Sequence, residues 1–309
     1  MARPKKVKEV EKVKETIDTP VKADKSKIEA LKKVIAESNR KYGKNTIISA
    51  NDAPDIDRIP TGIKELDSLI GGGVPCGRFT ILWGGKSCGK TTAILSIIAE
   101  AQKQGKVCAL IDAEASFDKA WAQKQGVVLE DLVLMQGYNT AEEALDNFVT
   151  LMKEKVVDLL VIDSVSALSP KGEQETAKGK EKSIADDTMA LMARKLSQFF
   201  RISAGQVHKS NCAVILIGQT RTNLGGFIAF DSLAGGNALG HYASLILSFK
   251  RGPKTDSPTI KEFNEETDEN ETVVVGFNSK VRIDKTKINS KIEGSELSTP
   301  FLFEKGFKV

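Results

Sequence analysis

The sequence predicts an α/β fold in which a mostly parallel, twisted sheet is flanked by helices and ends in antiparallel hairpins. From about residue 60, short apolar runs that end in Gly, Asp or Gln alternate with amphipathic helical segments, which is typical of strands joined by crossover helices. Beyond residue 242, strand patterns follow one another without helices between them. With 309 residues, 40% of them apolar, the chain is long enough to bury a sizeable core.

The chain divides into three predicted segments: a flexible basic arm (1–25), an amino-terminal helical segment for packing between protomers (26–58) and a core (59–309). Residues 1–27 hold nine Lys or Arg against five acids, so their net charge of +4 equals that of the whole chain. Apolar residues at helical spacing follow, and Gly43 is a stop signal. The apolar stripe of this helix packs either on its own domain or on a neighbouring subunit.

The elements of the core follow in order. Strands are expected at 79–83, 107–112, 159–163 and 213–218, and helices at 89–104, 116–125, 140–154 and 187–204. The terminal strands are expected at 243–249, 272–277, 280–284 and 300–303. Two polar stretches, 171–183 and 253–271, are expected to be surface loops.

Composition excludes several classes of protein. No apolar stretch reaches the roughly 18 residues that a membrane-spanning helix needs, and the lysine-rich amino terminus has no apolar signal core. We therefore expect a cytoplasmic protein without a membrane partner. Four cysteines without CxxC spacing and two histidines do not predict a zinc site or a disulfide framework.

The strongest motif, GGKSCGKT, fits GxxxxGK[ST] and lies between a predicted strand and a predicted helix. Its glycines allow backbone N–H groups to surround phosphates, Lys90 neutralises the β and γ oxygens, and the Thr91 hydroxyl binds Mg²⁺. Cys88 is interpreted as a small filler and not as a reactive thiol. The expected ATP-binding residues of this loop are Gly84, Gly85, Lys86, Ser87, Cys88, Gly89, Lys90, Thr91 and Thr92.

Three further side chains follow predicted strands at the edge where open α/β sheets bind ligands. Asp163 is the candidate for holding Mg²⁺, although an acid in this position can also be an ordinary turn or helix cap. Glu114 is placed to orient and polarise the water that attacks the γ-phosphate. Gln219 is able to hydrogen-bond a γ-phosphate oxygen, and the Gly-rich stretch 220–236 begins directly after it.

The order of GGKSCGKT, LIDAEASFD, LLVIDSVSAL, ARKLSQFFR, GGNALGHYAS and VRIDKTKI resembles bacterial-type RecA recombinases across roughly residues 27 to 305. The resemblance implies a RecA-type P-loop NTPase core and a DNA-dependent ATPase that uses ATP and Mg²⁺. It also implies homo-oligomeric helical filaments on single-stranded DNA that exchange strands with homologous duplex DNA. A RecA-fold helicase or loader, or a nucleotide-gated DNA-coating filament without strand exchange, remain alternatives.

The resemblance assigns roles at the nucleotide. Glu114 would activate water, Gln219 would sense the γ-phosphate, and Trp121 would stack on adenine with Asp118 near the base. Lys285 and Lys287 would reach across the subunit interface to the γ-phosphate held by the neighbour. On pattern alone, Trp121 is also consistent with a core tryptophan, and the two lysines with an exposed strand.

The resemblance also implies a DNA-binding surface. Arg194, Ser197 and Arg201 would contact the DNA backbone from one helix face. Two loops, near 171–187 and 220–236, would hold DNA. The expected contacts in the second loop are Arg221, Phe227, Gly235 and Gly236.

This chain departs from the family pattern in two places. Gly240 and His241 stand where the family usually has a basic residue and a phenylalanine that contact the neighbouring protomer. The sequence ends at Val309, soon after the last predicted strand, so we expect that the carboxyl-terminal domain of many family members is absent.

Overall fold

The computed structural model describes residues 24–43, 46–174, 191–223, 230–233, 237–264 and 269–307. The chain separates into two units, Met1–Asp55 and Ile56–Val309. The expected basic arm, apart from its last two residues, lies outside the described residues.

The first unit contains the predicted amino-terminal helix, α1 (Lys25–Tyr42), followed by a short 3₁₀ turn, η1 (Ala50–Asp52). The Asp24 carboxylate caps α1 by accepting from the Ser26 backbone N–H at 2.9 Å. No residue of α1 is buried, and Leu31 and Val34 are each 56% exposed. The apolar stripe read from the sequence is therefore exposed within its own unit.

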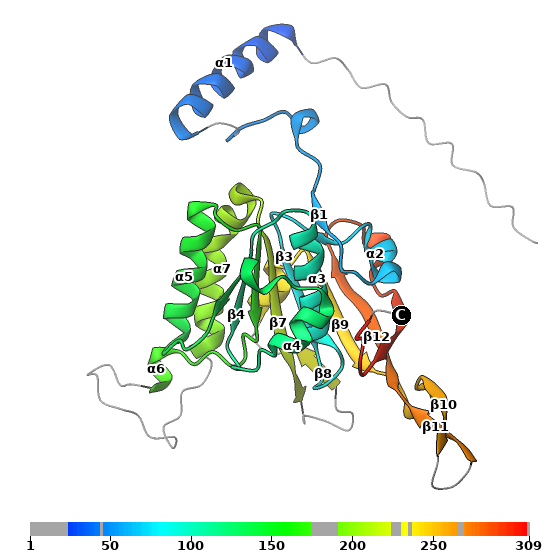
Figure 1. Cartoon of the computed structure of the whole chain (residues 1–309). Coiled ribbons are helices and arrows are strands. Elements are labelled where there is room, and N and C mark those ends of the chain that lie inside the picture. Colours follow the sequence, from blue (N-terminus) through cyan, green and yellow to red (C-terminus); the bar gives the residue numbers. More distant parts are fainter. Residues whose placement is uncertain are drawn as a thin grey trace, which may run out of the picture. The chain divides into compact units, whose positions relative to one another are not determined.

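The second unit is built on a large sheet (Figure 1). Within the described residues it has nine strands in the order β13-β12-β9-β3-β7-β6-β4-β5, with β8 paired to β7. The strands from β9 to β5 in that order run parallel, whereas β12, β13 and β8 are antiparallel to their neighbours. Their bounds are β3 (Phe79–Gly84), β4 (Cys108–Asp112), β5 (Leu132–Met135), β6 (Leu159–Asp163), β7 (Ala213–Asn223), β8 (Phe230–Leu233), β9 (Leu245–Arg251), β12 (Gly276–Thr286) and β13 (Glu296–Leu302). The expected parallel sheet with a terminal antiparallel hairpin is confirmed.

Helices cover both faces of this sheet (Figure 1). One face packs on α2 (Lys64–Ile70), α3 (Lys90–Lys103) and α4 (Lys119–Gln125), and is called here the α3 face. The other packs on α5 (Ala141–Glu154), α7 (Leu191–Ser210) and α8 (Asn237–Tyr242), and is called the α7 face. Because both faces are covered, every residue of β4 and β6 is buried, which explains why these strands read as continuous apolar runs.

Several element boundaries differ from the sequence prediction. α4 begins at Lys119 and not at 116, because the Asp112 carboxylate accepts from the Ser116 and Phe117 N–H groups and Asp118 caps the helix. α7 continues to Ser210, beyond the expected 204. β13 begins at Glu296, whereas 300 was expected. The short elements β1 (Arg58–Ile59), β2 (Val74–Pro75), η2 (Leu129–Asp131), α6 (Lys171–Gln174), η3 (Lys254–Asp256) and η4 (Ser290–Ile292) complete this unit with the hairpin below.

The prediction of a surface loop at 253–271 is wrong. β10 (Thr259–Asn264) and β11 (Glu269–Val274) form an antiparallel hairpin that projects from the main sheet (Figure 1). Every residue of β11 is exposed, so the stretch lacks the alternation of buried apolar residues by which strands are recognised. The strand expected at 272–277 is divided between β11 and β12. Of the other expected loop, 171–174 is helical and the remainder lies outside the described residues.

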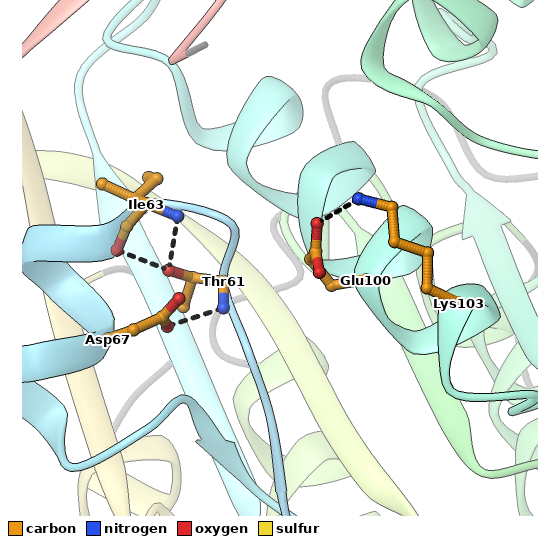
Figure 2. A network of polar contacts seen from close by, with 5 residues as sticks. All are labelled: Thr61, Ile63, Asp67, Glu100 and Lys103. Carbon is orange, nitrogen blue, oxygen red and sulfur yellow. Dashed lines mark hydrogen bonds and ion pairs between the residues drawn. The ribbon is translucent and has the colours of Figure 1, made fainter. Parts of the chain in front are cut away.

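A polar turn at the start of α2 is held by its own hydrogen bonds (Figure 2). The Asp67 carboxylate accepts from the Thr61 N–H at 2.7 Å, and the Thr61 hydroxyl oxygen accepts from the Ile63 N–H at 3.1 Å. Gly62, at φ +77°, lies so close to α3 that an added Cβ would be 2.2 Å from the Ser96 Oγ. The turn that starts α2 therefore packs directly against α3, and only glycine fits there.

Candidate nucleotide site

The candidate site is assembled at the carboxyl edge of the parallel strands, where β3, β4 and β6 end and β7 passes from its parallel pairing into its pairing with β8. In the sheet register, Gly84 lies beside Gln219, and Asp112 lies beside Asp163. The four strand ends that the sequence singled out are thus neighbours in space, as the crevice rule for open α/β sheets predicts.

The loop between β3 and α3 has a tightly constrained backbone. Gly84, at φ +149°, faces the Phe249 carbonyl oxygen, which would be 2.1 Å from an added Cβ. Ser87 and Gly89 also have positive φ values of 53° and 99°. The Lys90 ammonium donates to the carbonyls of Gly84 at 3.0 Å and of Gly85 at 2.5 Å. The lysine thus lies across the mouth of the loop, and phosphate oxygens are stronger acceptors for the same donors.

Cys88 is enclosed within this loop. It is 1% exposed, its thiol donates to the Gly85 carbonyl at 3.0 Å, and its own carbonyl accepts from the Ser279 hydroxyl at 2.9 Å. Burial raises the pKa of the Cys88 thiol, although the Lys90 charge lowers it. Lys86 and Ser87, at the tip of the loop, are exposed.

Thr91 and Asp163 form the pair expected to hold a divalent cation. The Thr91 hydroxyl donates to the Asp163 carboxylate at 2.8 Å, and Asp163 is only 8% exposed. Burial raises the pKa of Asp163 to about 6; the Thr91 hydrogen bond opposes this rise and the nearby Glu114 charge adds to it. A buried carboxylate at neutral pH, next to a hydroxyl at the start of α3, fits the oxygen ligands that Mg²⁺ prefers.

Glu114 is held by side chains from two neighbouring strand ends. Its Oε1 accepts from the Ser164 hydroxyl at 2.7 Å and from the Gln219 side-chain amide at 2.9 Å. Glu114 itself is exposed, so its second carboxylate oxygen is accessible to water. Sequence reasoning missed Ser164, and the only signal for it was its place directly after Asp163.

A second layer of contacts supports the segment that carries Glu114. The Asp112 carboxylate, 4% exposed, accepts from the Phe117 N–H at 2.9 Å and from the Gln136 side-chain amide at 2.7 Å. Gln136 follows β5 and was also missed, because nothing in its local sequence distinguishes it from a surface glutamine. These bonds fix the turn between β4 and α4.

An aromatic pocket of about 290 Å³ opens beside the phosphate loop. Apart from residues of that loop, its lining consists of Arg251, Phe277, Phe301 and Phe303. The Arg251 guanidinium lies over the Phe277 ring, 4.4 Å from its centroid, and 5.9 Å from that of Phe303. This wall could not be predicted from the sequence, because its residues come from β9, β12 and the segment around the end of β13.

Trp121 belongs to α4, and Asp118 is the residue at its amino-terminal cap. The Trp121 indole N–H donates to the Thr92 hydroxyl at 3.1 Å, and the half-buried ring packs against the core. The Asp118 carboxylate accepts from the Trp121 backbone N–H at 3.0 Å and caps α4. With Thr91 they line a cavity of only about 50 Å³, which is too small for a purine ring. Stacking on adenine would therefore have to use the outer side of the Trp121 ring.

Lys285 and Lys287 contact the carboxyl end of α8. The Lys285 ammonium donates to the Gly240 carbonyl, and the Lys287 ammonium donates to the His241 carbonyl at 2.9 Å. Burial and the neighbouring Lys287 charge lower the pKa of Lys285, while Glu293 raises it.

These two lysines are not part of the phosphate-loop site of the same chain. Lys285 lies opposite Ile246 on β9, three residues before the Phe249 that borders Gly84. That separation corresponds to roughly 10 Å along the strand, and Lys287 is farther still. The structure thus leaves both lysines away from Lys90.

The candidate DNA-binding residues lie on α7 and in the stretch after Gln219. Arg194 and Arg201 are exposed and Ser197 is half-buried; their spacing puts all three on one side of α7, which starts near the carboxyl edge. β7 continues to Asn223 and pairs with β8, so part of the expected loop 220–236 is a β-hairpin. Phe227, Gly235 and Gly236 lie outside the described residues, and for Arg221 the description is limited to its backbone in β7.

Neither a preformed metal-binding cluster nor a membrane-spanning helix is found within the described ranges. Among these residues, no three His, Cys, Asp or Glu side chains gather into a cluster that could hold a metal ion by themselves. Across the same part of the chain, no helix is both long enough and apolar enough to cross a membrane.

Comparison with known proteins gives a family match and a curated relative. The family model of the RecA N-terminal domain matches residues 29–308. Protein RecA of Psychrobacter arcticus is 42% identical over 233 residues, which are 74% of this chain and 64% of that relative. The chain therefore spans less than two thirds of the length of the curated relative that it matches.

Proposed function

Because the chain belongs to the RecA family, we propose that it is a DNA-dependent ATPase that forms helical filaments on single-stranded DNA and pairs that strand with homologous duplex DNA. The observation that carries the proposal is the meeting, at one sheet edge, of the phosphate loop, the Thr91–Asp163 pair and the Glu114–Gln219 contact. Recombination and repair in the cytoplasm would be the setting of this activity.

The phosphate loop would hold the triphosphate of ATP. The backbone N–H groups of residues 85–91 and the start of α3 provide donors for phosphate oxygens. Lys90 would exchange its two carbonyl acceptors for the β and γ oxygens. Thr91 and Asp163 would together hold Mg²⁺, Asp163 through a water molecule, and the cation would stabilise the charge on the phosphates.

Glu114 would act as the group that orients the attacking water. One of its oxygens is engaged by Ser164 and Gln219, which fixes the carboxylate and leaves the other oxygen for water. If Gln219 turns to the γ-phosphate when ATP binds, it leaves Glu114. Because Gln219 directly precedes the β7–β8 hairpin, such a change would reach the stretch 220–236.

The site would be completed by a second protomer. Lys285 and Lys287 lie far from the phosphate loop of their own chain, and two adjacent ammonium groups suit an anion such as a γ-phosphate. Both currently contact carbonyls at the end of α8, the helix that follows the stretch 220–236. Binding of a neighbour's nucleotide would compete for these donors and so couple ATP to the DNA-binding stretch.

The DNA contacts proposed here address phosphates and base stacks. Arg194 and Arg201 are exposed on α7 for phosphate contacts. Such contacts carry little sequence information, so binding would show weak base preference. The exposed apolar stripe of α1 would pack on a neighbouring protomer, giving a head-to-tail contact that propagates as a helix.

The test is ATP turnover by the full chain with and without single-stranded DNA at modest salt, with Glu114→Gln as the matched variant. Strong stimulation by DNA that disappears in the variant supports the proposal, and strand exchange with a homologous duplex is the next assay. Equal turnover with and without DNA would favour a loader or helicase ATPase. DNA coating that depends on ATP but needs no turnover would favour a nucleotide-gated filament.

A further inference from the structure

β12 contains an irregularity at the point where it delivers the two lysines. Ile283 pairs with Leu247 of β9, but Lys285, two residues later, pairs with Ile246, only one residue away on the partner strand. Asp284 is thus an extra residue on β12 and has no Cα partner on β9. Such a bulge changes the face of the sheet to which the following side chains point.

The consequence for the lysines follows from the faces of their partners. Ile283 and Leu247 belong to the core cluster on the α3 face, whereas Ile246 belongs to the cluster on the α7 face. In an unbroken strand, residue 285 would lie on the same face as Ile283. The extra residue therefore transfers Lys285 to the α7 face, where the end of α8 lies. Lys287, two residues later, points to the same face.

The bulged residue is held by side chains from two other strands. The Trp83 indole N–H of β3 donates to the Asp284 carboxylate at 2.7 Å, and the Ser248 hydroxyl of β9 donates to its other oxygen at 3.1 Å. The exposed Arg282 guanidinium lies 3.7 Å from that second oxygen. Trp83 packs against the core on the α7 face, so the anchor is itself fixed.

We infer that Asp284 is a positioning residue: by binding Trp83 and Ser248 it stabilises the bulge that presents Lys285 and Lys287 on the α7 face. An aspartate in the middle of a half-buried strand has no packing value of its own, and its carboxylate is matched by two donors at short range. The use of the lysines for a neighbour's phosphate rests on the proposed function. Their placement on that face rests on the geometry alone.

The placement is tested by cross-linking in the full chain. The four native cysteines are buried, so a short bis-maleimide will join two introduced thiols in the pair Lys285→Cys and His241→Cys. Adding Asp284→Ala should reduce the yield severalfold, because the unbulged register moves residue 285 to the α3 face. Asp284→Asn, which keeps an oxygen acceptor for the indole, should restore it. An undiminished yield with Asp284→Ala overturns the inference.

A second variant covers the case in which Asp284→Ala does not fold. Trp83→Phe keeps an aromatic ring in the core and removes the N–H donor together with part of the ring volume, so it should also lower the cross-linking yield. A yield in Trp83→Phe equal to that of the parent pair overturns the inference.

A second experiment tests the functional consequence: it measures DNA-dependent ATP turnover of the chain with both lysines intact. Asp284→Ala should lower kcat by roughly 10- to 100-fold and leave the KM for ATP within about twofold, because the phosphate loop is unaltered. Asp284→Asn should stay near the parent value. If the double variant Lys285→Ala and Lys287→Ala turns over ATP normally, the proposed role of the lysines is wrong, whereas the cross-linking result still decides their placement.

Discussion

The carboxyl edge of the sheet and the lysine pair at the end of α8 carry charges of opposite sign, and in both regions the charged form of a side chain is disfavoured. At the carboxyl edge, burial raises the pKa of Asp163 to about 6, so its negative charge is disfavoured there. At the lysine pair, burial and Lys287 lower the pKa of Lys285, so its positive charge is disfavoured. Each region gains from a bound counter-charge, a cation at the first and an anion at the second. In the proposed function these two regions would be half-sites of one reaction, carried on separate parts of the same chain.

The largest effect should come from the carboxyl-edge half-site. Glu114→Gln removes the water-orienting carboxylate but keeps an oxygen that Ser164 and Gln219 can contact. We expect a loss of about 10³-fold in DNA-dependent turnover with ATP binding retained, measured by steady-state hydrolysis and nucleotide titration. Glu130→Gln, an exposed change on η2, is the matched control. Turnover in Glu114→Gln equal to that of the control would show that the Glu114 carboxylate is not needed for ATP hydrolysis.

The lysine half-site should give the next largest effect. The double variant Lys285→Ala and Lys287→Ala should lose on the order of 10²-fold in turnover, because two cations are removed from the developing phosphate charge. Its affinity for ATP measured in dilute solution without DNA should be unchanged, since the phosphate loop of the same chain lacks these residues. A large loss of ATP affinity in the isolated chain would contradict the separation of the two half-sites.

Stability offers a smaller test of the carboxyl-edge charge. The pKa of Asp163 rises from 3.8 to about 6 on folding, so Asp163→Asn should stabilise the nucleotide-free protein by up to about 3 kcal/mol at pH 7. Because the folded state binds the proton of Asp163 more tightly than the unfolded state, the ionised carboxylate destabilises the folded protein. This destabilisation is complete above about pH 6 and disappears as the pH falls toward 4. Chemical unfolding at pH 7 and pH 4.5 measures both values.

The controls for this stability test are an exposed aspartate and the metal. Asp131→Asn, on η2, should leave the unfolding free energy within about 0.5 kcal/mol at both pH values. Asp163→Asn should also abolish the stabilisation that Mg²⁺ and ATP give together to the parent chain. An Asp163→Asn variant that is no more stable at pH 7 than the parent would show that the charge is well accommodated.

The smallest effect concerns the exposed arginines of α7, Arg194 and Arg201, which belong to neither half-site. Arg194→Ala or Arg201→Ala should weaken single-stranded DNA binding modestly and reduce the slope of log affinity against log salt by about 0.7 each. Lys209→Ala, exposed near the other end of α7, is the control. Fluorescence anisotropy over a series of salt concentrations measures these slopes. Unchanged slopes in both arginine variants would show that DNA does not bind along this side of α7.

The parallel core could be predicted from sequence because β3, β4, β6 and β7 are buried on both faces and read as apolar runs. The residues at their ends share one edge for the same topological reason, so Asp163 and Gln219 could be named before their neighbours were known. The β10–β11 hairpin could not be predicted, because its exposed strands bury nothing and show no alternation.

Other features depend on contacts between segments far apart in the sequence. Phe277 and Phe303 join Arg251 only after β9, β12 and β13 pair, and Trp83 is 201 residues away from the Asp284 that it binds. The β12 bulge also could not be predicted from the sequence, because Lys285 and Lys287 are spaced two residues apart as in a regular strand. Their sequence spacing does not reveal on which face of the sheet they lie.

The central claim, that one reaction uses two half-sites from different protomers, is tested most directly by mixing two inactive variants. One is Glu114→Gln, which keeps the lysine pair, and the other is the double variant Lys285→Ala and Lys287→Ala, which keeps the carboxyl-edge half-site. In an equal mixture on single-stranded DNA, about a quarter of head-to-tail interfaces would unite two intact halves, so turnover should recover to roughly that fraction of the parent value. Turnover that stays at the level of the separate variants would contradict the claim.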